Sequence, residues 1–178
     1  RARAIQREVE PTEAPIAIPT VLPLSTWSED GPMKSETAKA LYRNYLVKYG
    51  RMTGIASSRR DISDELEEFS DSLALHREDL TGEIQFLIED GRSKADDLGG
   101  HISAKKAKIA GLPRGSPRRA ELDDELELFK QMLNGERSDT ALEVAEVKAR
   151  LAAFRKDKRV FLIDAINTRF HGRDWRNQ

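Results

Sequence analysis

The sequence contains no cysteine, has few aromatic residues and has no long hydrophobic run. The absence of cysteine excludes disulfide bonds, thiolate zinc sites and cysteine nucleophiles. No stretch approaches the ~20 consecutive apolar residues that a transmembrane helix needs, so we expect no membrane partner. Apolar residues make up only 38% of the chain and charged residues 34%, which disfavours a thick two-layer core. The 178 residues therefore suit a single domain, with or without an ordered arm.

Motifs for catalysis and for binding of nucleotides or metals are also lacking. The sequence has no Gly-x-Ser-x-Gly, HExxH or GxxxxGK[ST] pattern. His76, Asp79 and Glu83 share neighbouring faces of one predicted helix, but zinc takes three or four convergent ligands and no second histidine is close in sequence. We therefore predict a protein that is not an enzyme, with no catalytic residue, metal, cofactor or small-molecule substrate.

Residues 1–34 differ from the rest of the chain because proline recurs at every fourth position from 11 to 23. Each proline removes a backbone donor and favours extended geometry before it, which predicts an extended Pro-rich N-terminal arm. A disordered linker is poor in Ile, Val and Leu, and this arm is not. The arm either packs along its own domain or docks on a neighbouring subunit. Its candidate partner-binding residues are Ile16, Ile18, Val21, Leu22, Leu24 and Trp27.

The chain after residue 34 has the pattern of an all-α protein. Helical spacing of apolar residues, together with capping signals, predicts four helices within one helical domain, residues 35–178. Gly91 and the pair Asn134 and Gly135 are expected to end the second and third helices. The predicted helices span about 35–49, 61–90, 117–133 and 140–168.

Two of these helices, the second and the fourth, repeat apolar residues at alternating steps of three and four, which is typical of a coiled-coil seam. Their matched lengths predict a long antiparallel helical hairpin or coiled-coil bundle, with residues 91–139 as the connection. His76 and Lys158 are polar residues within the seam, so we expect them to fix its register, with Lys158 reaching solvent or a carboxylate. The predicted seam consists of Ile62, Leu66, Phe69, Leu73, His76, Leu80, Val147, Leu151, Phe154, Lys158 and Phe161.

The net charge of −1 conceals a segregation of charge along the chain. Residues 61–90 carry eleven acids and one base, and residues 91–119 carry eight bases and two acids. Complementary charge on exposed helices sets the choice and orientation of partners more than it adds stability. Either these faces are simply solvated, or the acidic helix meets a basic surface in its own chain or in another subunit.

Two basic segments are candidates for nucleic-acid contacts. Residues 105–119 carry six cations without an acid, which suit either phosphate contacts or, as we favour, contact with an acidic protein surface. These cations are Lys105, Lys106, Lys108, Arg114, Arg118 and Arg119. The C-terminal stretch interleaves bases with aromatics, and Phe170, Arg173 and Trp175 are its candidate anchor residues. A protein pocket is the favoured target over single-stranded nucleic acid, because Trp and Arg are typical interface anchors.

These features together predict a structural or assembly protein, a subunit of a larger multi-subunit particle, with a phage or virus virion component as the favoured example. We expect protein partners, in a homo-oligomer or a hetero-assembly, with nucleic acid secondary. One alternative is a nucleic-acid-binding accessory factor that uses residues 105–119 and the C-terminal tail, and another is a regulatory coiled-coil adaptor. Because the chain as given shows no secretion signal, we expect an intracellular (cytoplasmic) location or one within a virion.

Overall fold

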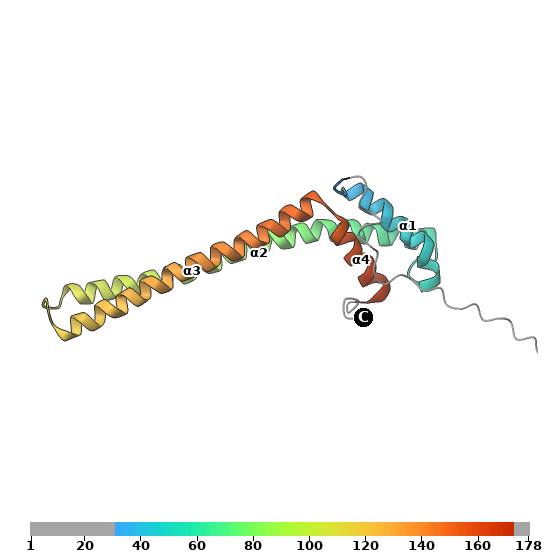
Figure 1. Cartoon of the computed structure of the whole chain (residues 1–178). Helices are drawn as coiled ribbons and strands as arrows, with labels where there is room; N and C mark the ends of the chain where they lie inside the picture. Colours follow the sequence, from blue (N-terminus) through green and yellow to red (C-terminus); the bar gives the residue numbers. More distant parts are fainter. Residues whose placement is uncertain (1–30, 173–178) are drawn as a thin grey trace, which may run out of the picture.

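A computed structural model describes residues 31–172 as four α-helices, with no strand in that range (Figure 1). The helices are α1 (Ser35–Thr53), α2 (Arg59–Ala110), α3 (Pro117–Lys156) and α4 (Arg159–His171). This arrangement confirms the all-α fold class. Several predicted contact residues fall in the terminal segments outside the described residues, namely Ile16, Ile18, Val21, Leu22, Leu24, Trp27, Arg173 and Trp175.

The helices α2 and α3 lie side by side in opposite directions and form a rod (Figure 1). With 52 residues, α2 is about 78 Å long at 1.5 Å per residue. At one end of the rod, α1 and α4 pack on each other and beside the beginning of α2. We call this end the head, and the opposite end, where residues 111–116 join α2 to α3, the tip.

The connection between the two long helices is much shorter than the sequence pattern predicts. The predicted connection over residues 91–139 is wrong, because α2 continues through Gly91 and α3 continues through Asn134 and Gly135. A glycine inside a helix costs only about 1 kcal/mol relative to alanine. Apolar packing near the tip outweighs that cost. The packed residues at the tip are Ile102, Ile109, Leu122 and Leu126, with Leu112, Phe129 and Leu133 partly buried against them.

The first helix also ends later than predicted, at Thr53 instead of residue 49. Its C-cap is Gly54, with a positive φ of 72° that favours glycine. Gly50 remains inside the helix and is buried, and a Cβ there would lie 3.0 Å from the Cβ of Ala56. Gly50 therefore permits close packing of the following loop on α1.

The last predicted helix, over residues 140–168, is interrupted between α3 and α4. Asp157 has an extended backbone, and its Oδ1 accepts hydrogen bonds from the Arg159 N–H at 2.9 Å and the Met33 N–H at 3.3 Å. The Lys158 N–H donates to the Met33 carbonyl at 2.9 Å. Backbone groups near the start of α1 therefore replace the helical hydrogen bonds that are lost at the break.

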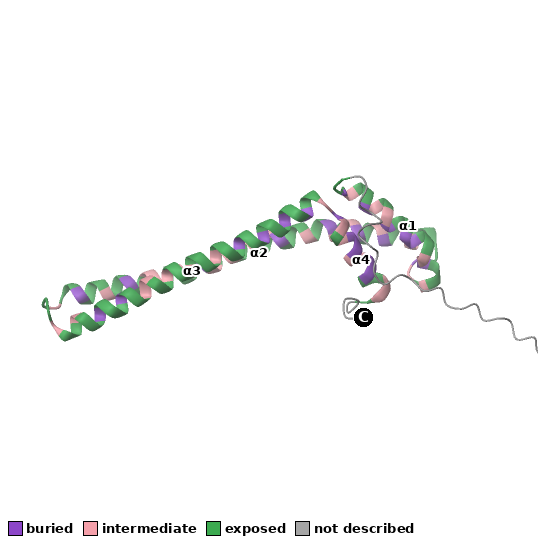
Figure 2. Ribbon diagram, in the orientation of Figure 1, coloured by how far each residue is buried: buried purple, intermediate pink, exposed green. Residues whose placement is uncertain are grey.

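The core consists of one cluster in the head that continues along the rod, and a smaller one at the tip (Figure 2). The predicted seam residues all line the inner side of the helices, although two of them, Lys158 and Phe161, lie beyond the break. The buried ones are Phe69, Leu73, Leu80, Val147, Leu151, Phe154 and Lys158, and the partly buried ones are Ile62, Leu66, His76 and Phe161.

Between the two clusters, α2 and α3 approach each other closely at Gly91. A Cβ built on Gly91 would lie 2.4 Å from Thr140 Oγ1 and 2.5 Å from Thr140 Cγ2. Both distances are below van der Waals contact, so any side chain at this position forces the helices apart. Gly91 thus fixes the spacing of the rod near its middle.

We predict that Gly91→Ala destabilises the protein by about 1–3 kcal/mol, because the added methyl group overpacks the contact with Thr140. Gly82→Ala is the matched control, since it lies in the same helix and a Cβ there meets nothing within 4 Å. That control should be neutral or stabilise by up to about 1 kcal/mol. Urea unfolding followed by circular dichroism measures both, and equal effects of the two substitutions would contradict the prediction.

Candidate functional site

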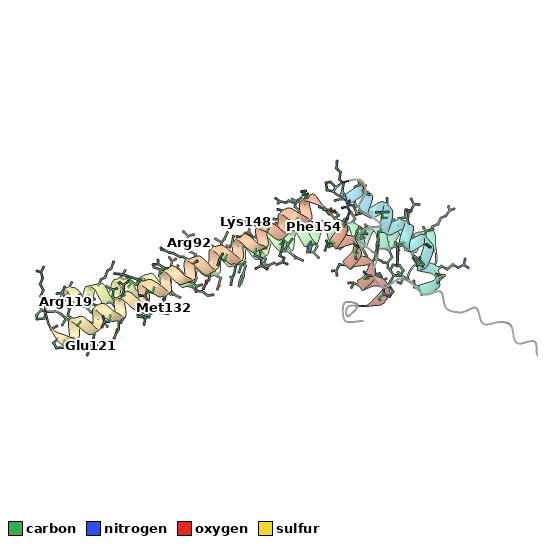
Figure 3. The ribbon with its side chains drawn as sticks, viewed as in Figure 1. Arg92, Arg119, Glu121, Met132, Lys148 and Phe154 are labelled. Atoms are coloured by element: carbon green, nitrogen blue, oxygen red, sulfur yellow. The ribbon has the colours of Figure 1, made fainter. Side chains whose placement is uncertain are left out.

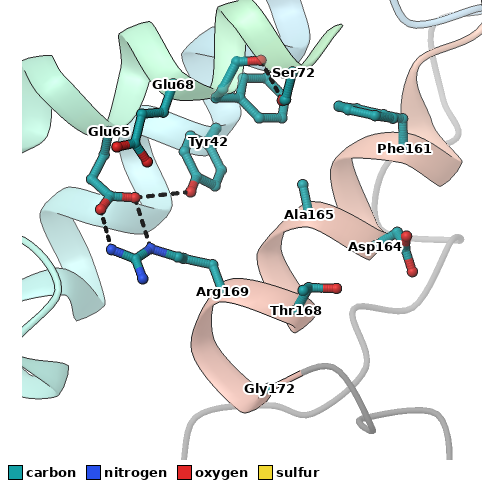
Figure 4. A pocket seen from close by; sticks show the side chains of 11 residues that line it. Tyr42, Glu65, Glu68, Ser72, Phe161, Asp164, Ala165, Thr168, Arg169 and Gly172 are labelled. Atoms are coloured by element: carbon teal, nitrogen blue, oxygen red, sulfur yellow. Dashed lines mark hydrogen bonds and ion pairs between the residues drawn. The ribbon is translucent and has the colours of Figure 1, made fainter. Parts of the chain in front are cut away.

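A buried carboxylate joins three helices in the head (Figure 4). Glu65 of α2 accepts hydrogen bonds from the Tyr42 hydroxyl of α1 at 3.4 Å and from Arg169 Nε of α4 at 2.9 Å. A second Arg169 nitrogen, Nη2, donates to the other oxygen of Glu65, so the guanidinium binds the carboxylate in a bidentate manner. The Glu65 side chain is only 10% exposed, whereas the Arg169 side chain that reaches it is 47% exposed.

The pKa values of Tyr42 and Arg169 are shifted by burial and by the neighbouring Glu65 carboxylate. Burial raises the pKa of the Tyr42 phenol, and the charge of Glu65 adds to the increase. The hydrogen bond to Glu65 raises the pKa of Arg169 above its usual value. Tyr42 therefore stays protonated and Arg169 stays charged near neutral pH, as expected of a positioning contact.

Sequence reasoning counted Glu65 only among the acids of residues 61–90. Its position is informative nevertheless, because it lies three residues after Ile62 and four before Phe69, on the inner side of α2. A carboxylate at such a position needs a cationic or hydrogen-bonding partner. Arg169 was not among the predicted site residues, although it directly precedes Phe170, which packs edge-on against Tyr45 at 4.9 Å.

Next to this ion pair, α2 and α4 enclose a groove with a volume of about 500 Å³ (Figure 4). Its floor is apolar, formed by Phe69, Phe161 and Ala165. Carboxylates stand at its edges, those of Glu65, Glu68 and Asp164. We call it the α2–α4 groove, and Tyr42 of α1 also contributes to its lining.

The two polar residues of the predicted seam lie against aromatic rings near the α3–α4 break. The His76 ring lies 4.7 Å from the Phe154 ring and 5.1 Å from the Phe161 ring. Lys158 is buried, its Nζ lies 4.1 Å from the Phe154 ring centroid, and it donates to the carbonyls of Phe154 and Arg155. Burial lowers the pKa of Lys158. The expected solvent or carboxylate partner is therefore wrong, because the last turn of α3 supplies carbonyl oxygens instead.

The outer side of α2 carries exposed acids. A residue two positions after an inward one points about 200° round the helix, and Asp71, Glu78 and Glu89 follow inward residues in this way. We define the acidic face as Glu67, Glu68, Asp71, Glu78, Asp79 and Glu89, all of which are exposed. Within residues 31–172 none of them makes a hydrogen bond or an ion pair. The acidic face is therefore not neutralised by the described part of the chain.

Two large apolar side chains lie within the acidic face. Leu75 is 57% exposed and Phe86 is 67% exposed. They are eleven residues apart, which is close to three helical turns, so both project from the same side of α2. An apolar pair framed by uncompensated acids has the composition of a protein-binding surface.

The six predicted phosphate contacts lie within residues 105–119 near the tip, where Figure 3 shows Arg119, whereas the acidic face spans residues 67–89 of α2. They therefore do not meet the acidic helix within this chain. Three of them pair instead with acids at the beginning of α3, in the pairs Lys105–Glu125, Arg118–Glu121 and Arg119–Asp123. The other three, Lys106, Lys108 and Arg114, are exposed and make no ion pair within residues 31–172.

No helix within residues 31–172 combines the length and the hydrophobicity that crossing a membrane requires. No group of three or more His, Asp or Glu side chains in that range could hold a metal ion.

The chain was compared with known proteins in three ways. No family model matches it, no curated protein matches it and no solved structure matches it. The function must therefore be inferred from the residues and surfaces of the chain itself.

We predict that Arg169→Met destabilises the protein by about 1–2 kcal/mol, because Glu65 is left buried with only the Tyr42 hydroxyl. The matched control is Arg150→Met, which removes an ion pair with Glu83 in which both side chains are about half exposed. Its effect should stay within about 0.5 kcal/mol.

Adding Glu65→Gln to Arg169→Met should recover part of the lost stability, since no uncompensated charge then remains buried. Urea unfolding of these three variants and of the unsubstituted chain gives the free energies. If Arg150→Met costs as much as Arg169→Met, burial of the carboxylate is not the cause.

Proposed function

We propose that this protein is a non-enzymatic structural subunit that builds a larger multi-subunit particle, with a phage or virus virion as the favoured setting. In this proposal, α2 and α3 act as an antiparallel coiled-coil hairpin that spaces the head from the tip. The alternation of three and four in the seam supports the coiled-coil assignment. Protein partners then bind along the outer faces of the rod.

The acidic face with Leu75 and Phe86 is the observation that carries the proposal. Fully burying a Leu or Phe side chain contributes about 1.5–3 kcal/mol, which the isolated rod leaves unused. The surrounding carboxylates form no ion pair within the described part of the chain, so a basic protein surface with an apolar recess is the complementary partner. Another copy of the chain or a second kind of subunit can supply it.

Further apolar side chains on the outside of the molecule support an assembly role over a solitary one. They lie on α1, α3 and α4 as well as α2, so that more than one side of the rod and head can be covered. Those about half exposed or more, besides Leu75 and Phe86, are Val47, Met52, Ile88, Leu128, Met132, Leu142 and Val160.

We predict that the full chain associates and that Leu75→Ser/Phe86→Ser weakens this association by at least about tenfold, the equivalent of 1.4 kcal/mol. Val47→Ser/Met52→Ser is the control, because it removes similarly exposed apolar groups from α1 instead of the acidic face. Light scattering across a wide concentration range measures the mass of each variant, alone and with proteins that co-purify from the native source.

Added salt should also weaken the association, because the acidic face contributes charge to it. A full chain that remains monomeric at every concentration and recovers no protein partner from its source would falsify the proposal. Loss of association in both double variants alike would show that the acidic face has no special part in it.

The nucleic-acid accessory function is a second candidate because Lys106, Lys108 and Arg114 at the tip make no ion pair with any residue from 31 to 172. If these three contact duplex phosphates, the logarithm of the binding constant should fall with the logarithm of salt concentration with a slope of about −3. Changing all three to Gln should abolish that slope, whereas Arg92→Gln/Lys148→Gln on the side of the rod should not. Negligible DNA affinity at low salt contradicts this candidate.

A further inference from the structure

We propose that the α2–α4 groove binds the C-terminal tail of this same chain, residues 173–178, with the indole of Trp175 on its apolar floor. This contact lies within one chain and shares only Glu68 with the acidic face of the assembly proposal above.

The position of the last described residue supports this occupant. Gly172 itself lines the groove, and Trp175 follows only three residues later. Three residues span at most about 10 Å, so the indole reaches only surfaces close to the end of α4. Gly172 has a φ of 87°, which favours glycine and takes the chain out of the helical path at this point.

The size and chemistry of the groove suit an indole. Its volume of about 500 Å³ is in the range of pockets that enclose small aromatic groups. The Phe69 and Phe161 rings lie 5.9 Å apart along its floor, and Phe69 also stacks on Tyr42 at 4.4 Å. Tryptophan prefers such a site, apolar beneath and polar at the edge, because its N–H needs a partner near water.

The charges of the two surfaces are complementary. The tail carries Arg173 and Arg176 with one acid, Asp174. At the edge of the groove, Glu68 is exposed and makes no ion pair within residues 31–172. Glu65, in contrast, is already saturated by Tyr42 and Arg169, so Glu68 is the carboxylate that an arginine of the tail would meet.

Attachment to α4 favours the chain's own tail over other occupants. A short flexible connection gives a tethered segment an effective concentration in the millimolar range, which a second copy or a separate partner rarely reaches. The other tryptophan, Trp27, precedes Gly31, whose carbonyl accepts a hydrogen bond from Arg159 at the beginning of α4, so the experiment must distinguish it from Trp175.

The experiment uses the intrinsic fluorescence of the full chain. Trp27→Phe leaves Trp175 as the single tryptophan. We expect its emission to be blue-shifted relative to the urea-unfolded chain and protected from acrylamide, with no change on dilution. Adding Glu68→Lys should raise the quenching constant at least twofold, whereas Glu67→Lys, on the adjacent exposed residue outside the groove lining, should leave it unchanged.

Several results would overturn the proposal. Emission and quenching equal to those of the unfolded chain would show that Trp175 is in solvent. Protection that disappears on dilution would assign the groove to the tail of a second copy. In a Trp175→Phe chain, a response of Trp27 to Glu68→Lys would assign the groove to the N-terminal segment. Circular dichroism of each variant verifies that the helices remain folded.

Discussion

A rod of two helices can bury only one side of each helix, and this constraint determines most of the other features of the molecule. The inner sides carry the apolar seam, and the outer sides must remain soluble, which explains why 34% of the chain is charged. The same geometry leaves Leu75 and Phe86 without cover. It also demands close approach where side chains are small, as at Gly91 and Thr140. The apolar side chains of the seam are thus buried, while long outer surfaces of the two helices remain exposed.

In the head, two sets of contacts hold the ends of the helices and prevent them from fraying. The first set lies at the break at Asp157 and Lys158, where hydrogen bonds to Met33 replace those of a continuous helix. The buried ammonium of Lys158 satisfies carbonyls at the C-terminus of α3, where a positive charge is also favoured by the helix dipole. The second set is the ion pair of Glu65 and Arg169, which fastens α4 to α2. These contacts turn α4 away from the rod and open the α2–α4 groove.

The sequence is sufficient to predict the helical class and the side of each long helix that faces inward, because both follow from local periodicity. Residues such as Leu73 and Val147 show this directly. Helix ends were predicted poorly for two physical reasons. A glycine such as Gly91 resembles a stop signal, although packing on the facing helix outweighs its modest cost. The break before α4 depends on Met33, which is more than a hundred residues away and leaves no trace in the spacing around Phe154 and Phe161.

The charged residues show the same contrast: their distribution is visible in the sequence, but their pairing depends on the tertiary structure. The run of acids in residues 61–90 is visible in the sequence. Whether each acid is paired depends on whether its side chain points to the inner or the outer side of α2. Glu65 points inward and is paired, whereas Glu68, one turn later, is exposed at the edge of the groove. The cations of residues 105–119 begin fifteen residues after the last of these acids, about 22 Å along α2, and half of them pair with the beginning of α3 instead. A net charge near zero therefore arises from surfaces of opposite sign held apart by a rigid rod. Such separation favours contacts between different molecules, since the two ends of one chain cannot meet.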